Sequence, residues 1–558
     1  MKYYIAGILL VGFTLVSCGQ KTTTYQDQIA ATNRLFKNWN NNHTPGATIG
    51  IIKDGNLIYS KGYGMANLEH DIPNDEHTIF NIASNSKQFT AACLSILELR
   101  GEIEFTQNVK TFFPEFPSYF EKITIDHLLH HTSGLRDFTQ IHYLSGLRPD
   151  DYYDDQDIQK WINSQQELNF QPGEKYLYSN SGYWLLGQII EKVSGLSLAK
   201  FAEQEIFEPL NMSGTLFYDN NTLVVKNRAS GYFANRSGAY RHIYSNLEHT
   251  GNGGVFSSLA DLKKWDDEYY NREVLKDDFW ELMGKPGMLN NRDTIPYSGG
   301  LILGTHKGLS TMDHGGRAPG YLSNIVRFPG EKLTIIILAN SSNLNASRIC
   351  YDVADIFLAN VLNKEPAPPS ELMVTTTLKS ELLEKYAGHY WSTENNISRR
   401  IVMSNDTLKY ERSRGRVNAL VPINSTSFKM LGTPAGMNVK VAFEVDGAST
   451  KMRFVENGKE VDQWDSYIPT DYTPEELSTF SGVFYSPEIK TSYELQIEEP
   501  GQLFLYINGR RTVPLRPVMK NLFSSPIGVF RFVAQNNEGI VAFRISTPRV
   551  KNLLFEKS

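Results

Sequence analysis

Residues 78–101 read Thr78-Ile-Phe-Asn-Ile-Ala-Ser84-Asn-Ser-Lys87-Gln-Phe-Thr-Ala-Ala-Cys-Leu-Ser-Ile-Leu-Glu-Leu-Arg-Gly101. Apolar residues recur at helical spacing from Phe89, and Gly101 is placed to end the helix. Because an α-helix turns every ~3.6 residues, Ser84 and Lys87 are expected one turn apart on the same face. That spacing suits a nucleophilic hydroxyl beside an amine that takes its proton, with free N–H groups at the helix start favouring negative charge. The alternative is that Ser84 is only a helix N-cap.

Composition places the chain among soluble globular proteins. It has 558 residues, 41% of them hydrophobic and 21% charged, so two to four domains are expected. The net charge is −6 with no long Lys/Arg run, which gives nucleic-acid binding no electrostatic support. The three cysteines, Cys18, Cys93 and Cys350, are too few for a disulfide framework or a cysteine metal site. Cys93 and Cys350 are expected to be buried.

The N-terminus reads as an export signal. An apolar run from Ile5 to Val16 is shorter than the ~20 residues that a membrane span needs. It ends in Leu15-Val-Ser-Cys18, which resembles the bacterial lipobox, where the signal peptide (1–17) is removed and the cysteine is lipidated. The alternative is an ordinary signal peptide. We therefore expect a membrane-anchored lipoprotein facing the periplasm or the cell surface, with residues 18–28 as a polar tether.

The pattern over residues 29–362 predicts strands at both ends and helices between them. A helix is expected over 29–41, and two β-rich runs flank Asp54-Gly55 as a hairpin. Strands return between 299 and 340, and a helical pattern covers 347–362. The two ends are therefore expected to share one antiparallel sheet.

A second candidate motif is Tyr178-Ser-Asn180, expected in a loop before a helix over residues 184–195. In an extended loop the two outer side chains point the same way. A phenol can act as a base or relay where cations lower its pKa, and an asparagine amide can hydrogen-bond a substrate carbonyl. The alternative for Tyr178 is a structural loop tyrosine.

Two other patterns, a histidine cluster and a glycine-rich turn, are candidates for ligand binding. His127, His130 and His131 lack the cysteine or carboxylate partners of a metal site, so none is predicted. The glycine-rich turn at 251–254 lacks the Lys-Ser/Thr ending of a phosphate-binding loop. Ser257 or Ser258 is instead expected to cap the helix that carries Asp261.

Three motifs in this order, Ser84-x-x-Lys87, Tyr178-Ser-Asn180 and His314-Gly-Gly316, resemble the serine β-lactamase and penicillin-binding-protein superfamily, in its class C-like branch. The resemblance covers about residues 26–362. It implies an α+β fold, with helices on both faces of the sheet, a mostly helical subdomain, and the site between them. No metal or organic cofactor is implied.

The resemblance also implies a role for each matching residue. Ser84 would form an acyl-enzyme, and Lys87 or Tyr178 would handle its proton; which of the two is the base stays open. Asn180 would hold the substrate amide or ester. The backbone N–H groups of Ser84 and Arg317 would form the oxyanion hole.

The third motif departs from the β-lactamase pattern, which is Lys-Thr-Gly or close to it. His314-Gly-Gly316 is more like that of D-peptidases, esterases and carboxypeptidase-like relatives. A neutral histidine recognises an anion less strongly than lysine does. Arg317 either restores that charge or points to solvent. The departure disfavours β-lactamase activity.

The last third of the chain contains a repeat. A linker is expected over residues 363–379, and Tyr386-Ala-Gly388-His-Tyr390 is matched by Phe480-Ser-Gly482-Val-Phe484. Each copy follows a leucine-containing helical turn and precedes short alternating strands. Two all-β modules are therefore expected, at 380–468 and 469–558, similar to the lipocalin-like barrels of some family members. They carry no catalytic constellation, and whether they cover the site, bind a partner or aid assembly stays open.

Together these features predict an exported serine hydrolase acting on an amide or ester, as a D-amino-acid peptidase, a carboxypeptidase or an esterase. A β-lactamase and a non-hydrolytic penicillin-binding-like lipoprotein are the alternatives. The expected partners are a small peptide, ester or β-lactam-like substrate and a membrane reached through the lipid on Cys18, with no nucleic acid.

Overall fold

The computed structural model describes residues 25–558 except 149–150, 236, 245, 247, 363–375, 377, 414–415, 434–437, 448, 457, 499–500 and 536–538. The predicted signal peptide, Cys18 and most of the predicted linker lie outside the described residues. Within them, no helix combines the length and the apolar character needed to cross a bilayer.

The sheet of the N-terminal domain has seven antiparallel strands, and it joins the two ends of that domain as predicted. Its order is β10 (Tyr297–Ser298), β11 (Leu301–His306), β12 (Leu309–Ala318), β13 (Tyr321–Phe328), β14 (Leu333–Ala339), β1 (Ala47–Lys53) and β2 (Asn56–Tyr63). The hairpin between β1 and β2 turns at Asp54 and Gly55, whose φ angles of 51° and 77° are those of a type I′ turn.

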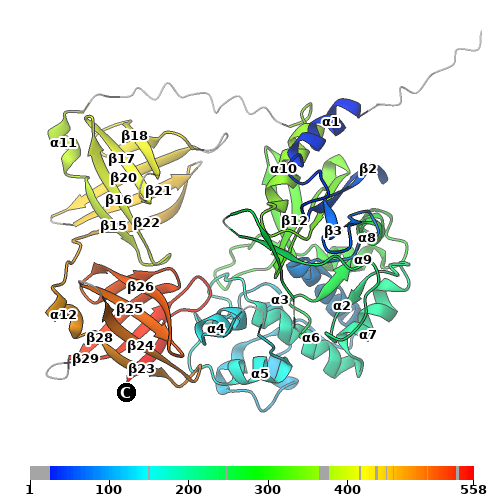
Figure 1. Ribbon diagram of the computed structural model, residues 1–558, viewed down its shortest axis with the longest axis horizontal. Coiled ribbons are helices and arrows are strands. Elements are labelled where there is room, and N and C mark those ends of the chain that lie inside the picture. Colours follow the sequence, from blue (N-terminus) through cyan, green and yellow to red (C-terminus); the bar gives the residue numbers. More distant parts are fainter. Residues whose placement is uncertain are drawn as a thin grey trace, which may run out of the picture.

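Helices cover both faces of this sheet (Figure 1). On one face lie α1 (Gln26–Leu35) and α10 (Ala346–Phe357), and on the other lie α2 (Lys87–Leu99) and α8 (Leu259–Asn271). Every residue of β14 is buried between the two layers. The structure corrects two boundaries: α1 spans 26–35 rather than 29–41, which shortens the predicted tether, and α10 ends at Phe357 rather than at 362. Phe36 and Leu358, with ψ near 10°, leave the helical conformation and end the two helices.

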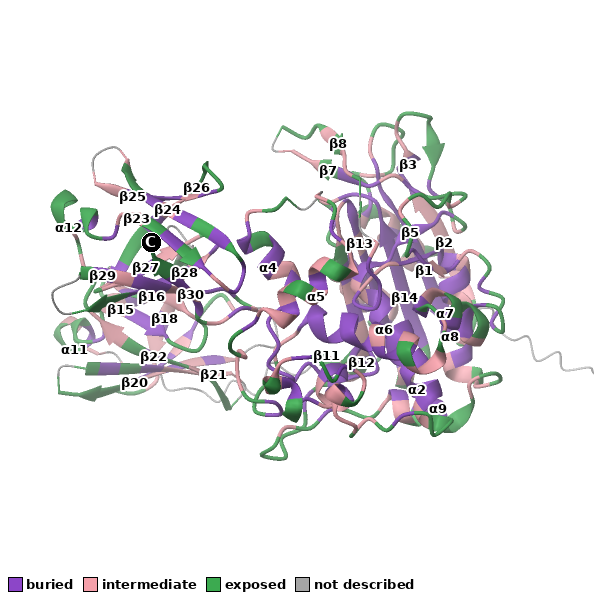
Figure 2. Cartoon of the chain, turned by 90° about the horizontal axis from the view of Figure 1, so that it is seen from below, coloured by how far each residue is buried: buried purple, intermediate pink, exposed green. Residues whose placement is uncertain are grey.

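A mostly helical subdomain packs beside α2, and Figure 2 shows burial concentrated in the sheet, α2 and α6. Its helices are α3 (Ile125–Leu129), α4 (Phe138–Leu144), α5 (Asp155–Asn163), α6 (Asn180–Ser194) and α7 (Leu198–Ala202), with α9 (Lys276–Met283) near α2. Short elements complete the domain: η1 (Ala83–Ser86), η2 (Val109–Thr111), η3 (Ser118–Lys122), η4 (Glu203–Phe207), η5 (Pro329–Glu331), β3 (Met65–Asn67), β4 (Ile72–Pro73), β5 (Phe80–Asn81), β6 (Leu216–Phe217), β7 (Tyr232–Ala234), β8 (Tyr240–His242) and β9 (Val255–Ser257).

The two predicted β modules are closed eight-stranded barrels, each preceded by a short helix. Barrel 1 follows α11 (Ser380–Glu384) and contains β15 (Gly388–Ser392), β16 (Ile397–Ser404), β17 (Thr407–Ser413), β18 (Arg416–Pro422), β19 (Ser427–Met430), β20 (Val439–Asp446), β21 (Ser449–Glu456) and β22 (Lys459–Tyr467). Barrel 2 follows α12 (Pro474–Ser478) and contains β23 (Gly482–Ser486), β24 (Thr491–Glu498), β25 (Gln502–Ile507), β26 (Arg510–Met519), β27 (Leu522–Ser525), β28 (Gly528–Gln535), β29 (Gly539–Ser546) and β30 (Leu553–Lys557).

The repeated glycines, Gly388 and Gly482, begin the first strand of each barrel, which confirms the internal repeat. Barrel 2 lies against α4, and barrel 1 packs on barrel 2 (Figure 1). Cys93 and Cys350 are buried free thiols, as expected.

Candidate active site

Ser84 lies in the 3₁₀ turn η1, and the α-helix itself begins at Lys87. Ser86, rather than Ser84, is therefore the residue at the N-cap position of α2. A 3₁₀ turn has three residues per turn, so Ser84 and Lys87 still share a face. Ala83, just before Ser84, has a φ of 53°, and its N–H donates to Asn81 Oδ1 at 2.8 Å. The backbone of the residue before the candidate nucleophile is thus held in a sparsely populated conformation.

Strand β13 clamps this turn. Asn85 Nδ2 donates to Ser323 Oγ at 2.8 Å, and Ser323 Oγ donates to the Ile82 carbonyl at 2.7 Å. All three groups are buried. The nucleophile turn is therefore fixed to the sheet on one side by a short chain of satisfied hydrogen bonds.

Strand β12 approaches the same turn so closely that only glycine fits at position 316. A Cβ there would lie 2.3 Å from the Ile82 carbonyl oxygen and 2.3 Å from Ser323 Oγ. Strand β11 pairs with β12 only as far as Asp313, so the edge of β12 from His314 onward has no strand partner among the described residues on that side. Ser84, Gly316 and Arg317 all line the cavity that this edge borders.

Lys87, three residues after Ser84, is fully buried. Its Nζ donates to Asn180 Oδ1 at 2.9 Å and to the Asn252 carbonyl, and it lies 4.9 Å from the centroid of the Tyr178 ring. Burial lowers the pKa of Lys87 well below its usual value; Asp137 opposes this shift and Arg549 adds to it. The amine is thus poised to exist in the neutral, proton-accepting form.

The pKa of Tyr178 is shifted in the opposite direction from that of Lys87. Burial raises the pKa of its phenol, although an interaction with Ser84 and the charge of Arg549 act to lower it. Its ring lies 4.3 Å from that of His131 and 4.6 Å from the guanidinium of Arg549, measured between centres. The phenol therefore stays protonated near neutral pH.

Asn180 is the first residue of helix α6, which corrects the prediction that it lies in a loop before a helix starting at 184. The reason is Asp137, whose Oδ2 accepts both the backbone N–H and the Nδ2 of Asn180 at 2.9 Å. This carboxylate satisfies the start of α6 and turns Asn180 Oδ1 toward Lys87. Sequence reasoning missed Asp137, because it belongs to no motif.

His314 is buried at the far wall of the site. Its Nε2 lies 3.3 Å from the Tyr297 hydroxyl, and burial lowers its pKa to about 3, so the imidazole is neutral at physiological pH. The neighbouring Arg317 is exposed and borders the cavity.

The three closely spaced histidines, for which no metal site is predicted, have separate roles. His127 caps α3 through Thr124, His130 contacts Asp126 at 3.0 Å, and His131 Nδ1 accepts the Ser179 N–H at 3.2 Å beside the site. In the part of the chain that the structure describes, no group of three or more His, Cys, Asp or Glu side chains is arranged to hold a metal ion.

One cavity of about 1010 Å³ brings the predicted residues together. Its lining includes Ser84, Tyr178, Asn180, His314, Gly316 and Arg317, with Lys87 buried beneath. It also includes Arg549, from the loop that joins β29 and β30 of barrel 2. Sequence reasoning missed Arg549, since the residues around it carry no catalytic pattern.

Comparisons with known proteins show which family the chain resembles. The family model described as Beta-lactamase matches residues 30–355. Penicillin-binding protein 4* of Bacillus subtilis is 27% identical over 442 residues, which cover 76% of this chain and 96% of that relative. A D-aminopeptidase of Gluconobacter oxydans is 27% identical over 345 residues, covering 62% of this chain and 64% of the relative.

A solved structure of an octameric penicillin-binding protein homologue from Pyrococcus abyssi has a TM-score of 0.52 and 25% identity, covering 79% of this chain and 98% of that one. The family match, these relatives and this structure confirm the resemblance that the three motifs indicated. The chain belongs to the beta-lactamase family.

Proposed function

We propose that this protein is a serine hydrolase that cleaves an amide or ester of a D-amino-acid residue through an acyl-enzyme on Ser84. The observation that carries the proposal is Lys87, a buried amine with a strongly lowered pKa, which is one 3₁₀ turn along the chain from Ser84 and is held by Asn180 and the Asn252 carbonyl. The D-aminopeptidase relative supports the choice of substrate class.

In this proposal Lys87 is the general base. Ser84 Oγ bonds to the substrate carbonyl carbon as its proton moves to Lys87 Nζ. Tyr178 then donates its hydroxyl proton to the leaving nitrogen or oxygen as the bond from that atom to carbon breaks, and it takes the proton held by Lys87 in return. Water later attacks the acyl carbon and gives up a proton to Lys87, which passes a proton back to Ser84 Oγ as the acyl group leaves. Tyr178 is assigned as a proton donor rather than the base, since burial keeps its phenol protonated. The backbone N–H groups of Ser84 and Arg317 are assigned to the oxyanion, where losing one donor typically costs ~3–4 kcal/mol.

The test is intact-mass measurement after exposure to a fluorophosphonate probe. We expect one adduct on the wild type and on Ser449→Ala, a control at an exposed serine of barrel 1, and none on Ser84→Ala. No adduct on folded wild type would refute an activated Ser84 and leave the non-hydrolytic binding protein as the better account.

A substrate panel then separates the enzymatic alternatives. Amides and esters of N-blocked D-amino acids should be turned over, whereas a chromogenic cephalosporin should be a poor substrate because the neutral His314 stands where β-lactamases of the superfamily carry lysine. Cephalosporin turnover at rates near those of the esters would instead identify a β-lactamase.

We further propose that the protein is exported and anchored through lipid on Cys18, on the strength of the apolar run and the Leu15-Val-Ser-Cys18 sequence. Growth of an expressing bacterium with an alkyne fatty acid should label the wild type and Cys350→Ala, but not Cys18→Ala. Label retained on Cys18→Ala, or absent from the wild type, would contradict the anchor.

A further inference from the structure

The loop of residues 547–552, which joins β29 to β30, brings a barrel residue into the active-site cavity. We call it the Arg549 loop. Arg549 is the residue of this loop that lines the same cavity as Ser84 and Tyr178. Barrel 2 is thus not a separate appendage but forms part of the cavity wall.

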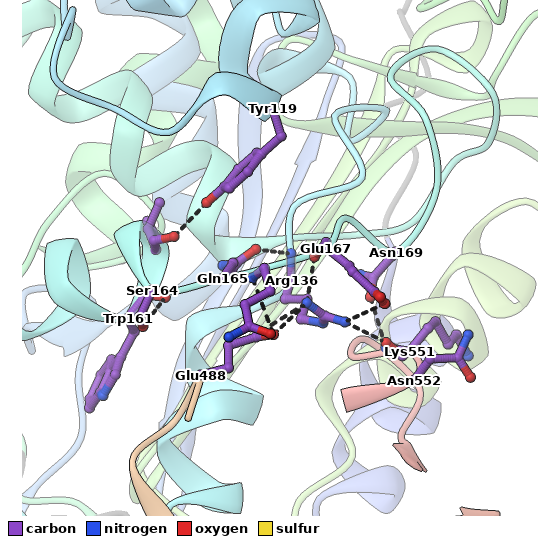
Figure 3. Close-up of polar contacts among 12 residues, drawn as sticks. Tyr119, Arg136, Trp161, Ser164, Gln165, Glu167, Asn169, Glu488, Lys551 and Asn552 are labelled. Carbon is purple, nitrogen blue, oxygen red and sulfur yellow. Dashed lines mark hydrogen bonds and ion pairs between the residues drawn. The ribbon is translucent and has the colours of Figure 1, made fainter. Parts of the chain in front are cut away.

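Barrel 2 is held in place by a buried polar network (Figure 3). Arg136, beside the α4 helix, forms an ion pair with Glu488 of barrel 2 at 2.8 Å, and both side chains are almost fully buried. The other end of the same guanidinium donates to the Lys551 carbonyl at 2.9 Å. Arg136 of the N-terminal domain therefore contacts both the body of barrel 2 and the Arg549 loop.

Further contacts fix the barrel and the backbone of the loop. Asn169 Nδ2 donates to the Arg549 carbonyl at 3.0 Å, and Asn169 Oδ1 accepts the Lys551 N–H at 2.7 Å. Tyr493 of barrel 2 donates from its hydroxyl to the Leu144 carbonyl at 2.7 Å. The position of the Arg549 side chain therefore follows from how barrel 2 docks.

The Arg549 guanidinium lies at the cavity wall and has more N–H donors than its contacts with the protein use. It lies 4.6 Å from the centre of the Tyr178 ring, and its Nη1 lies 3.4 Å from Asp137 Oδ2. A guanidinium has five N–H donors, and the side chain remains 37% exposed. Stacking on an aromatic ring fixes its plane while leaving the other donors open to the cavity.

Asp137 does not offer a site for a substrate cation. It is fully buried, and its oxygens already accept hydrogen bonds from Asn180, Thr139 and Gln140. Among the described residues that line the cavity there are two arginines, Arg317 and Arg549, and no aspartate or glutamate. Asp137 lies outside this lining and offsets part of the charge of Arg549. The charged side chains among the described lining residues are nevertheless the two arginines, so the cavity should attract an anion and disfavour an ammonium group.

We propose that Arg549 is a specificity-determining residue that binds a carboxylate of the substrate, so that barrel 2 selects what the active site accepts. The preferred substrate is a blocked D-amino-acid peptide that bears a free carboxylate, rather than one with a free α-ammonium group. This inference rests on the proposed function for the reacting centre, but carboxylate binding itself does not need the Ser84 hydroxyl.

Binding is measured by calorimetry in a Ser84→Ala background, where no turnover occurs. The anionic ligands are N-acetyl-D-alanyl-D-alanine and N-succinyl-D-alanyl-D-alaninamide, which carry a carboxylate at opposite ends. The neutral ligand is N-acetyl-D-alanyl-D-alaninamide, and the cation is D-alanyl-D-alaninamide. We expect one of the anions to bind at least tenfold more tightly than the neutral ligand, and the cation to bind most weakly.

Adding Arg549→Gln should abolish that tenfold advantage and leave the affinity for the neutral ligand within about threefold. Arg549→Lys should keep part of it, and Arg511→Gln, at an exposed arginine of barrel 2 outside the cavity, should keep all of it. Equal affinity for charged and neutral ligands, no binding of any ligand, or an anion preference that survives Arg549→Gln would overturn the inference.

Kinetics with Ser84 intact separate substrate binding from an effect on Lys87. At a pH where the fluorophosphonate-labelling profiles of the wild type and the variant have both levelled off, so that Lys87 is unprotonated in each, Arg549→Gln should lower kcat/KM at least tenfold for the anionic substrate and little for the neutral one if Arg549 binds the carboxylate. An equal loss on both would mean that Arg549 acts only through the charge of the site, and would refute the inference. A Ser84 that takes no fluorophosphonate while the binding preference persists would refute the proposed function alone.

Discussion

At the scale of single residues, the site depends on two buried groups whose pKa values move in opposite directions. Burial lowers the pKa of Lys87 and raises that of Tyr178, so the neutral amine and the neutral phenol coexist near physiological pH. The sequence left the choice of base open between the two, and their burial now favours Lys87. Neither shift is visible in the Ser-x-x-Lys spacing, because both depend on what packs around the motif.

The first prediction concerns the pH dependence of Ser84 labelling by a fluorophosphonate. Only unprotonated Lys87 accepts a proton, so the rate should rise with pH and level off above the pKa of Lys87. Because that pKa is lowered, the rise should be complete well below the value of ~10.4 for an exposed lysine. Second-order rate constants between pH 5 and 10 give the profile.

Two variants sharpen this test. Arg549→Gln removes a charge that lowers the pKa of Lys87, so its rise should move to higher pH, whereas Arg511→Gln should not shift it. Lys87→Arg should lose at least ~100-fold in rate at every pH, because a guanidinium does not deprotonate. A flat profile for the wild type would contradict Lys87 as the base.

At the scale of elements, the site is made where β12, the η1 turn and the start of α6 meet. The motifs placed Ser84, Tyr178 and His314 on three different segments, and the structure brings these segments to one cavity. The close approach of β12 to η1 explains why the third motif ends in glycine at position 316, since a Cβ would collide with the Ile82 carbonyl.

The second prediction follows from that contact. Gly316→Ala should push β12 away from the nucleophile turn, lower the rate of Ser84 labelling by ~100-fold or more, and cost about 1–3 kcal/mol of stability. Gly330→Ala is the matched control, because a Cβ there meets no atom within 4 Å. Labelling kinetics and urea denaturation measure the two effects, and near wild-type labelling of Gly316→Ala would show that this contact does not shape the site.

The sequence predicted helices and hairpins well only where neighbouring residues in the chain determine them. The Asp54-Gly55 hairpin and the Ser258 cap of α8 depend on neighbouring residues, and both are confirmed. The start of α6 was placed too late because Asn180 is held by Asp137, a residue on another segment. Arg549 was missed for the same reason, since its place in the cavity depends on a barrel docked through Arg136 and Glu488.

At the scale of the whole molecule, barrel 2 and the catalytic domain form one unit around a buried ion pair. Burial raises the pKa of Glu488 and lowers that of Arg136, so the loss of hydration outweighs their mutual attraction. Such a pair does little to drive docking, yet it penalises any change that leaves one member without the other. The pair therefore disfavours any docking of barrel 2 that buries one of the two charged side chains without the other.

The third prediction is a double-mutant cycle on this pair. Glu488→Leu and Arg136→Met should each cost about 3–5 kcal/mol in urea denaturation, whereas the double variant should cost clearly less than their sum. Glu498→Gln, which breaks the more exposed pair with Arg511, should cost at most about 1 kcal/mol. Additive costs for the two buried substitutions would show that the pair is not coupled across the interface.

Barrel 1 is attached differently, and the last prediction separates it from the site. Trp391 of barrel 1 is 4% exposed and packs against barrel 2 residues Val518, Leu522 and Val529. The described lining of the cavity includes no residue of 380–468. The Lys175–Glu394 ion pair to the catalytic domain, at 3.9 Å with both side chains more than half exposed, contributes little.

Trp391→Ala should therefore free barrel 1 from barrel 2 without disturbing Ser84. We expect a larger radius of gyration in small-angle X-ray scattering and a stability loss of about 3–5 kcal/mol. The rate of Ser84 labelling should stay within about twofold of wild type. Val461→Ala, at an exposed position of barrel 1, should change none of these. If Trp391→Ala instead slowed Ser84 labelling well beyond twofold, barrel 1 would have to act on the site through barrel 2, and its separation from the site would be refuted.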